Sequence, residues 1–250
     1  TEGSSLMIDF NSSSSTSGQV SALIDIGMQR LREQQAEREY LGASRLGIAC
    51  ERALQFEYAK APVDHGRAVQ GRMLRIFERG HVMEDCMVTW LKAAGFDLRT
   101  RKPNGGQIDF SVADGRLHGH VDGVIVGGPE GFSYPALWEC KALGHKSWAD
   151  LQKKGLAQSK PVYAAQVAIY QAYLELHEHP ALFTALNADT MDIYAELVPF
   201  DAALAQRMSD RAVKVITATE AGELLPRAFH NATHFECRMC HWQDRCWGMA

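Results

Sequence analysis

Residues 137–142, "LWECKA", place a glutamate and a lysine two positions apart inside an apolar run. Side chains alternate between the two faces of a strand, so we expect Glu139 and Lys141 on one face and Cys140 on the other. A surface strand with an ion pair would explain the pattern. The apolar flanks favour a buried strand instead, where each charge needs a partner because burying an ion costs several kcal/mol.

A second stretch, "GHVDGVIV", shows a related anomaly, because Asp122 opens another apolar run. A divalent cation between Asp122 and Glu139 would compensate the buried charges. Hard oxygen ligands suit magnesium or manganese, and a pair of carboxylates with water is a usual magnesium site. The two stretches together predict a metal site with a lysine beside it.

The order Asp122, Glu139, Lys141 resembles the PD-(D/E)XK nuclease superfamily, which carries an Asp on one strand and Glu-x-Lys on the next. The resemblance implies that both carboxylates and the backbone carbonyl of Cys140 hold the metal. It implies that Lys141 orients or helps deprotonate the attacking water and stabilises charge on the phosphate. The function expected is metal-dependent hydrolysis of phosphodiester bonds in DNA.

Two helical motifs strengthen the resemblance to the RecB-like branch of this superfamily. In "ERGHVMED", His81 and Glu84 share a helix face and match a G-H-x-x-E element. The resemblance implies that His81 is a metal ligand and Glu84 an acidic partner. In "AAQVAIYQAYL", Gln166 and Tyr170 match a Q-x-x-x-Y element, which implies a pair that contacts DNA and supports the site. A surface helix and an amphipathic helix with a core tyrosine are the plain alternatives.

The C-terminal stretch "CRMCHWQDRC" has the spacing C-x2-C-x5-C, which is typical of a metal site. Together with Cys50 in "LGIACERAL", it resembles the iron–sulfur nucleases, which include CRISPR-associated four-cysteine exonucleases and AddAB-type nuclease domains. The resemblance implies a 4Fe-4S cluster that joins the N- and C-terminal segments. A structural zinc ion is the alternative, with His241 or His234 in place of Cys50. The cluster ligands implied are Cys50, Cys237, Cys240 and Cys246.

Composition and periodicity predict a mixed α/β fold, with one central mixed β-sheet flanked by helices. The resemblance implies a restriction-endonuclease-like core. Of the 250 residues, 46% are hydrophobic, which is enough for a core, and the net charge of −4 permits only a local basic groove. Helices are expected at 20–40, 50–58, 68–94, 148–177 and 202–221. Strands are expected at 96–102, 106–112, 116–126 and 136–142, as an antiparallel meander, and at 182–188 and 192–200.

The domain organisation expected is a single nuclease domain over residues 19–250, with the cysteine cluster in segment 234–250. Residues 1–18 are predicted to be a disordered leader, partly an artificial remnant with Met7 as the native start. No apolar run approaches the length of a membrane span, and no signal peptide is visible. We therefore expect a cytoplasmic chain with no membrane partner.

The function hypothesis is an exonuclease on single-stranded DNA ends, acting in recombination, repair or CRISPR adaptation, with Mg or Mn and a 4Fe-4S cluster as cofactors. A catalytically inactive DNA-binding scaffold of a recombination complex is one alternative. A two-histidine, one-carboxylate iron oxygenase is another, because His118, His120 and Asp122 are expected on one strand face and a distant His230 could complete the set. Tyr163 and Trp148 are candidates for stacking on bases. A basic groove would be lined by Arg99, Arg101, Lys102, Lys146, Lys153, Lys154 and Lys160.

Overall fold

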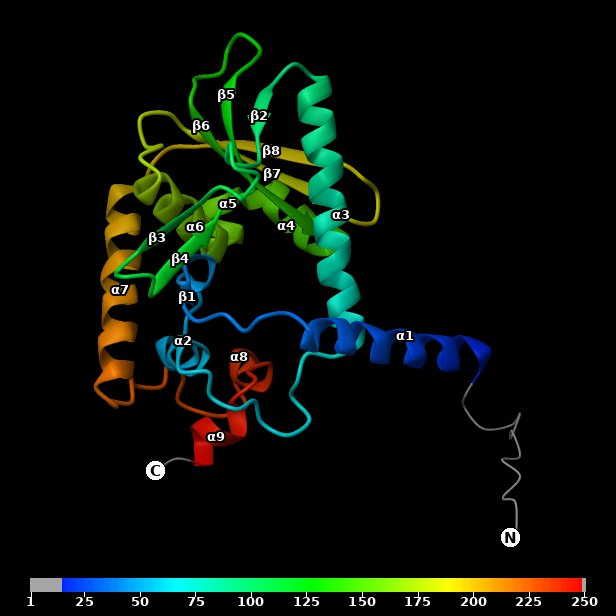
Figure 1. Ribbon diagram of the computed structural model, residues 1–250, viewed down its shortest axis with the longest axis vertical. Helices are drawn as coiled ribbons and strands as arrows, with labels where there is room; N and C mark the ends of the chain where they lie inside the picture. The colour runs from blue at the N-terminus through cyan, green and yellow to red at the C-terminus, as the bar shows by residue number, and fades with distance from the viewer. Residues whose placement is uncertain (1–14, 249–250) are drawn as a thin grey trace. The chain divides into compact units, whose positions relative to one another are not determined.

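Strand β6 (Ala136–Leu143), which contains Glu139 and Lys141, is the central strand of a five-stranded mixed sheet. The computed structural model describes residues 15–248 (Figure 1). β6 runs parallel to β7 and antiparallel to β5, and the two edge strands pair antiparallel with their neighbours. In spatial order the strands are β2 (Asp97–Arg99), β5 (Gly123–Gly127), β6, β7 (Ala181–Asn187) and β8 (Ile193–Val198).

A second, three-stranded sheet has the order β1-β4-β3, so the mixed α/β class is confirmed but the expectation of one sheet is wrong. Its strands are β1 (Leu41–Gly42), β3 (Asp109–Val112) and β4 (Leu117–His120). The predicted strand 116–126 breaks because Val121 donates its N–H to the carbonyl of Ile108 (3.0 Å) and completes the β3–β4 hairpin. Gly123 then pairs opposite Trp138 in the larger sheet. The break leaves Asp122 between the two sheets.

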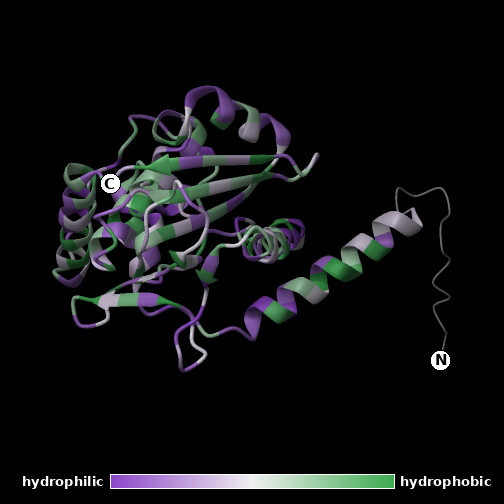
Figure 2. Cartoon of the chain, turned by 90° about the horizontal axis from the view of Figure 1, so that it is seen from above, coloured by the Kyte–Doolittle hydropathy of each residue, from purple (hydrophilic) through white to green (hydrophobic). Residues whose placement is uncertain are grey.

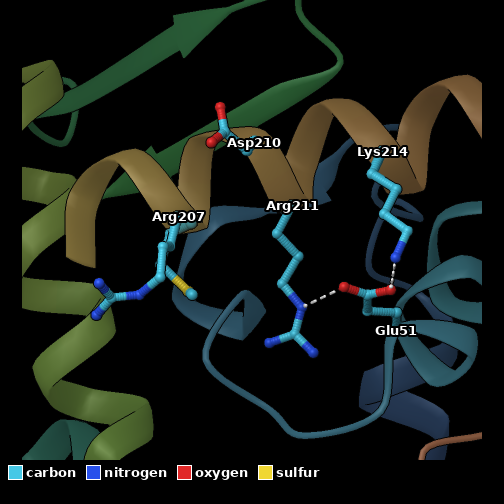
Figure 3. A pocket seen from close by; sticks show the side chains of 6 residues that line it. Glu51, Arg207, Asp210, Arg211 and Lys214 are labelled. Atoms are coloured by element: carbon cyan, nitrogen blue, oxygen red, sulfur yellow. Dashed lines mark hydrogen bonds and ion pairs between the residues drawn. The ribbon is translucent and has the colours of Figure 1, made fainter. Parts of the chain in front are cut away.

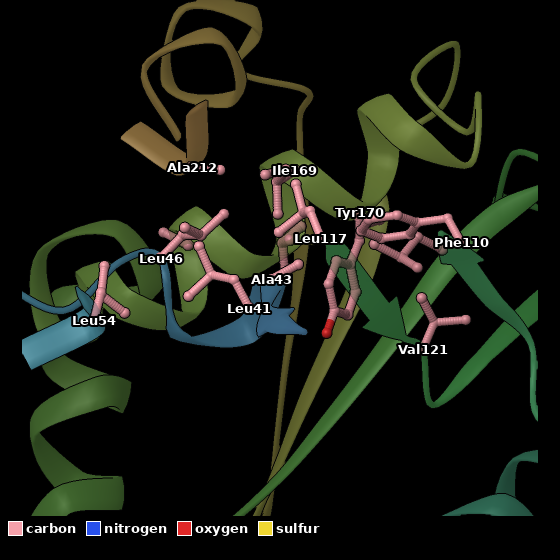
Figure 4. Close-up of a cluster of buried hydrophobic side chains, with 14 of the residues drawn as sticks. Leu41, Ala43, Leu46, Leu54, Phe110, Leu117, Val121, Ile169, Tyr170 and Ala212 are labelled. Carbon is pink, nitrogen blue, oxygen red and sulfur yellow. The ribbon is translucent and has the colours of Figure 1, made fainter. Parts of the chain in front are cut away.

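Three helices connect β6 to β7 and cover one face of the larger sheet. They are α4 (His145–Lys154), α5 (Leu156–Ser159) and α6 (Pro161–Tyr173). The single helix predicted for 148–177 is interrupted at Gly155, whose φ of 76° lies in the left-handed region, and again before Pro161, the first residue of α6. This face contains the larger hydrophobic core, part of which Figure 4 shows around Tyr170.

The opposite face of the sheet packs on the second half of α3 (Gly71–Ala93), through Met83 and Met87. Trp138 and Cys140 belong to this smaller core, whereas Leu137 belongs to the larger one. The alternation predicted for β6 is therefore confirmed, and the Cys140 side chain is buried on the face opposite to Glu139 and Lys141.

The C-terminal segment packs on the chain around α2 (Glu51–Tyr58), which also contacts α7 (Ala202–Glu220). Trp242 lies 6.0 Å from Phe56, centroid to centroid, and its indole N–H donates to the carbonyl of Ala61 (2.9 Å). Asp64 accepts the backbone N–H of Asp244 (2.6 Å). The short helices α8 (Phe235–Arg238) and α9 (Gln243–Gly248) are therefore fixed beside a much earlier part of the sequence (Figure 1). The 3-10 helix η1 (Ala43–Arg45) precedes α2.

The chain divides into two compact units, and everything above belongs to the larger one, Arg38–Ala68 with Gly80 onward. The smaller unit contains α1 (Thr16–Glu33) and the start of α3 up to Arg79, joined by an ion pair between Arg75 and Asp25. Helix α1 carries apolar and polar bands and buries no residue (Figure 2). Residues 1–14 of the expected leader lie outside the described residues. No helix within residues 15–248 has the length and apolar content needed to cross a bilayer.

Candidate active site

Glu139 is a fully buried carboxylate in the middle of the sheet, with a side-chain exposure of 0%. Its Oε1 accepts a hydrogen bond from the Gln166 amide (2.7 Å) and pairs with the ammonium of Lys141. Its Oε2 is also buried but has no hydrogen-bond partner among the described residues. Because an unpaired buried carboxylate oxygen is costly, this atom is well suited to bind a cation.

Asp122 lies next to Glu139, although it comes from the break between β4 and β5 and not from a strand. Its Oδ2 accepts the backbone N–H of Cys140 at 2.8 Å, and Cys140 directly follows Glu139 in β6. The predicted convergence of Asp122 with the Glu-x-Lys pair is therefore present in the geometry.

Glu84 on α3 adds a third acidic side chain near this pair. Burial, and next the Asp122 carboxylate, raise the pKa of Glu84 to about 7. Burial and the same Asp122 carboxylate raise the pKa of Glu139 to about 8. The three carboxyl groups therefore repel one another, and a bound cation would relieve that repulsion. His81 is exposed on α3, and no interaction within residues 15–248 joins it to these carboxylates.

Lys141 provides the positive charge of the site. Burial by itself lowers the pKa of Lys141, but the carboxylates of Glu139 and Asp122 outweigh burial and the pKa is raised, so Lys141 is an ammonium. Its Nζ lies 5.3 Å from the centroid of the Tyr163 ring, in a cation–π arrangement. Tyr163 thus flanks Lys141 from α6 while Glu139 holds it from the same strand.

Gln166 and Tyr170 both lie on α6 and are buried, with exposures of 6% and 2%. Gln166 orients Glu139 through its hydrogen bond, and Tyr170 packs edge-on against Phe110 with ring centroids 5.5 Å apart. Gln166 therefore supports the carboxylate from inside the core, and Tyr170 belongs to the larger hydrophobic core beside it. The candidate stacking residue Trp148 was predicted wrongly, because it is buried and its indole N–H donates to the carbonyl of Ala185 (3.0 Å).

The four cysteines of the expected cluster gather at the C-terminal segment. Burial and then the neighbouring Cys50 and Cys246 thiols raise the pKa of Cys237, and burial followed by Cys50, Cys246 and Cys237 raises that of Cys240. The guanidinium of Arg52 lies 3.8 Å from Cys246 Sγ. The four thiols are therefore near enough to interact electrostatically.

Another group of ligand side chains, which the sequence reasoning did not assemble, lies on the β3–β4 hairpin. Within residues 15–248 it is the one group of three whose ligand atoms all lie within 4.8 Å of one another: Asp109, His118 and His120. Asp122, which the oxygenase alternative combines with His120, is not in this group, and its Oδ2 accepts the N–H of Cys140. Asp109 could have been found from the hairpin register, in which it stands opposite His120.

Most residues of the expected basic groove are engaged locally. Arg99 pairs with Asp97 (3.3 Å), and Lys154 pairs with Asp150 (2.6 Å). Other charged side chains, from α2 and α7, line a shallow hollow between these helices (Figure 3). There Glu51 pairs with Lys214 (2.6 Å) and Arg211 (3.4 Å), and the lining contains none of the carboxylate-site residues.

No protein-family model and no curated protein matches the sequence. Solved structures do match: the protein SSO0001 aligns with a TM-score of 0.52 at 14% identity, over 94% of this chain and 98% of that one. The alkaline exonuclease LHK-Exo from Laribacter hongkongensis aligns with a TM-score of 0.51 at 13% identity, over 74% of this chain and 90% of that one. LHK-Exo in complex with dAMP gives a TM-score of 0.50 at 17% identity, with the same coverage. At these identities the chain shares the fold of these proteins.

Proposed function

We propose that this protein is a metal-dependent deoxyribonuclease of the PD-(D/E)XK type that acts on single-stranded DNA ends. One observation carries the proposal: the buried Glu139 pairs with Lys141 through one oxygen, and its other oxygen has no partner within residues 15–248, with Asp122 hydrogen-bonded to the adjacent residue. A buried acid beside a fixed ammonium and a second acid suits phosphodiester hydrolysis better than structural support. The shared fold with an alkaline exonuclease supports the same reading.

The donor set fits magnesium or manganese. Asp122 and Glu139 supply hard carboxylate oxygens, and the Glu139 oxygen without a partner is the best evidence that a cation belongs here. The groups that would hold the metal are Asp122, Glu139 and the backbone carbonyl of Cys140, and the resemblance adds His81 as a further ligand from the exposed side of α3. A metal bound there would lower the pKa of a water molecule and neutralise charge on the phosphate.

The protein's own groups position the reaction. Gln166 fixes Glu139 by donating to Oε1, so that the other oxygen of Glu139 stays free for the cation. Lys141 remains protonated and offers positive charge to the phosphate as negative charge develops on it. Glu84 on α3 interacts electrostatically with Asp122 and Lys141 and is the third carboxyl group of the site.

We also propose that Cys50, Cys237, Cys240 and Cys246 hold a 4Fe-4S cluster with a structural role. The four thiols affect one another's pKa and therefore lie near one another. Ligation by cysteine alone is typical of a 4Fe-4S cluster.

The histidines that could replace Cys50 in a zinc site already have backbone partners. His234 Nδ1 accepts the N–H of Glu236 (3.3 Å), and His241 Nδ1 bonds to the carbonyl of Arg67 (2.6 Å). The contact of His234 uses the lone pair of Nδ1, whereas the contact of His241 leaves the lone pair of Nε2 open, so a zinc ion bound with His241 stays the alternative to the cluster.

The test is an assay on end-labelled single-stranded DNA with manganese, with Lys141→Met alongside. We expect progressive shortening by the wild type only. If neither protein shortens the DNA and both bind it equally, the scaffold function replaces the nuclease. An absorbance spectrum with iron and sulfide analysis of anaerobically purified protein tests the cluster separately, and one zinc per chain without iron would overturn it.

A further inference from the structure

Three metal-ligand side chains meet on the outer side of the β3–β4 hairpin, apart from the carboxylate site. The register places Asp109 directly opposite His120, and His118 follows on the same face of β4. His118 Nε2 lies 2.8 Å from Asp109 Oδ2, and the two imidazole centroids are 4.4 Å apart. All three residues are half-buried, so their positions are restricted by packing.

The group has a polar atom that the protein leaves unsatisfied. His120 Nδ1 is buried and has no hydrogen-bond partner among the described residues. Its other ring nitrogen, Nε2, is 3.4 Å from the hydroxyl of Tyr40, whose ring also packs against His118 with centroids 4.7 Å apart. Tyr40 therefore closes one side of the group, and the imidazole of His120 is held in place with a free nitrogen.

We propose that Asp109, His118 and His120 bind a divalent transition-metal ion of the zinc class, at a second site distinct from the carboxylate site. Two imidazoles and one carboxylate are a donor set that suits zinc and its neighbours, whereas magnesium prefers oxygen donors alone. The compact spacing, with all ligand atoms within 4.8 Å, is that of residues around one small ion.

Lys102 competes with a metal ion for the carboxylate of Asp109. Its ammonium pairs with Asp109 Oδ1, an oxygen that accepts no hydrogen bond from any other group in the described part of the chain. A metal ion that binds Asp109 must displace this ammonium or share the carboxylate with it. The ion pair therefore lowers the affinity for metal, and its removal raises that affinity.

The position of the site indicates what the metal does. The three ligands come from β3 and the end of β4, and Tyr40 packs against them. His120 stands two residues before Asp122 in the sequence. A metal ion there fixes the point at which the chain leaves the small sheet and enters the larger one. The role is structural.

The experiment is equilibrium binding of zinc to metal-depleted full-length protein, measured by competition with a chromophoric chelator. All variants keep the six cysteines, so zinc bound by thiols is common to them and cancels in the comparison. Three variants are compared with the wild type: His118→Asn with His120→Gln, Lys102→Met, and Glu139→Gln as the matched control at the other site.

We expect the wild type and the Glu139→Gln control each to bind one zinc ion more than the double histidine variant. Lys102→Met should bind that zinc several-fold more tightly. Equal zinc binding with and without the two histidines would overturn the proposal. If the histidine variant does not fold, Lys102→Met decides alone: a tighter site supports the proposal, and an unchanged affinity refutes it.

Discussion

His120 and Asp122 are two residues apart in sequence, yet they belong to different chemical environments. His120 ends β4 and faces Asp109 across the hairpin, whereas Asp122 turns toward β6 and bonds to Cys140. The first environment combines imidazole nitrogens with one carboxylate and is half-buried, and the second consists of carboxylates around a fully buried glutamate. One residue, Val121, therefore separates a donor set suited to zinc-like ions from a donor set suited to magnesium or manganese.

The largest effect should come from the carboxylate site. Lys141→Met removes the ammonium that pairs with Glu139 and faces Asp122, and it should lower the single-turnover cleavage rate on labelled DNA by about 10²- to 10³-fold. Lys92→Met, an exposed lysine in the last turn of α3, is the matched control and should cleave like the wild type. Circular dichroism would check that both variants fold. If folded Lys141→Met cleaves DNA at the wild-type rate, the carboxylate site is not the site of cleavage.

A second large effect is expected at the cysteine site, whose sulfur ligands differ from the oxygen and nitrogen ligands of the other two sites. Cys240→Ser should lose iron and lower the melting temperature, because the C-terminal segment would keep only its packing and its contacts to Ala61 and Asp64. Cys86→Ser on α3 is the control, and it should keep both iron and stability. Retention of full iron content in Cys240→Ser would contradict the ligand assignment.

The two sites should respond to pH in opposite directions in protein freed of divalent metal. The raised pKa of Glu139 means that the native state holds a proton that the unfolded state releases, so the free energy of unfolding should fall as pH rises from about 4.5 to about 8. Burial lowers the pKa of His118 and His120, so their contribution is lost as pH falls below about 6.5.

Urea denaturation at a series of pH values would measure these trends. Glu139→Gln should abolish the fall in the free energy of unfolding above pH 7, and magnesium should reduce that fall in the wild type. The histidine variant should instead lose the dependence at acid pH. A free energy of unfolding of the wild type that does not change from pH 6.5 to 8 would refute the raised pKa of Glu139.

The smallest effect should come from Tyr163, which flanks Lys141. Tyr163→Ala removes the ring, and a cation–π contact of about 1 kcal/mol predicts a loss of about fivefold in the cleavage rate. Tyr163→Phe keeps the ring and should stay near the wild-type rate, whereas a role for the hydroxyl would make both variants equally slow.

Much of the carboxylate site could be predicted because its residues obey local rules. The alternation along β6 determines that Glu139 and Lys141 share a face, and the helical spacing puts Gln166 and Tyr170 on one side of α6. The break at Asp122 could not be predicted, because the run 116–126 reads as one strand. Only the competing pairings of Val121 with Ile108 and of Gly123 with Trp138 divide it.

The sequence alone determined the mixed α/β class, most helix and strand positions, and the face of β6 that carries charge, since these depend on periodicities within one element. The tertiary structure alone decided that there are two sheets, that Asp109 stands beside the two histidines, and that Trp148 is buried. Those features depend on pairings between segments far apart in the chain, and such pairings are selected by the packing of the whole core rather than by local propensity.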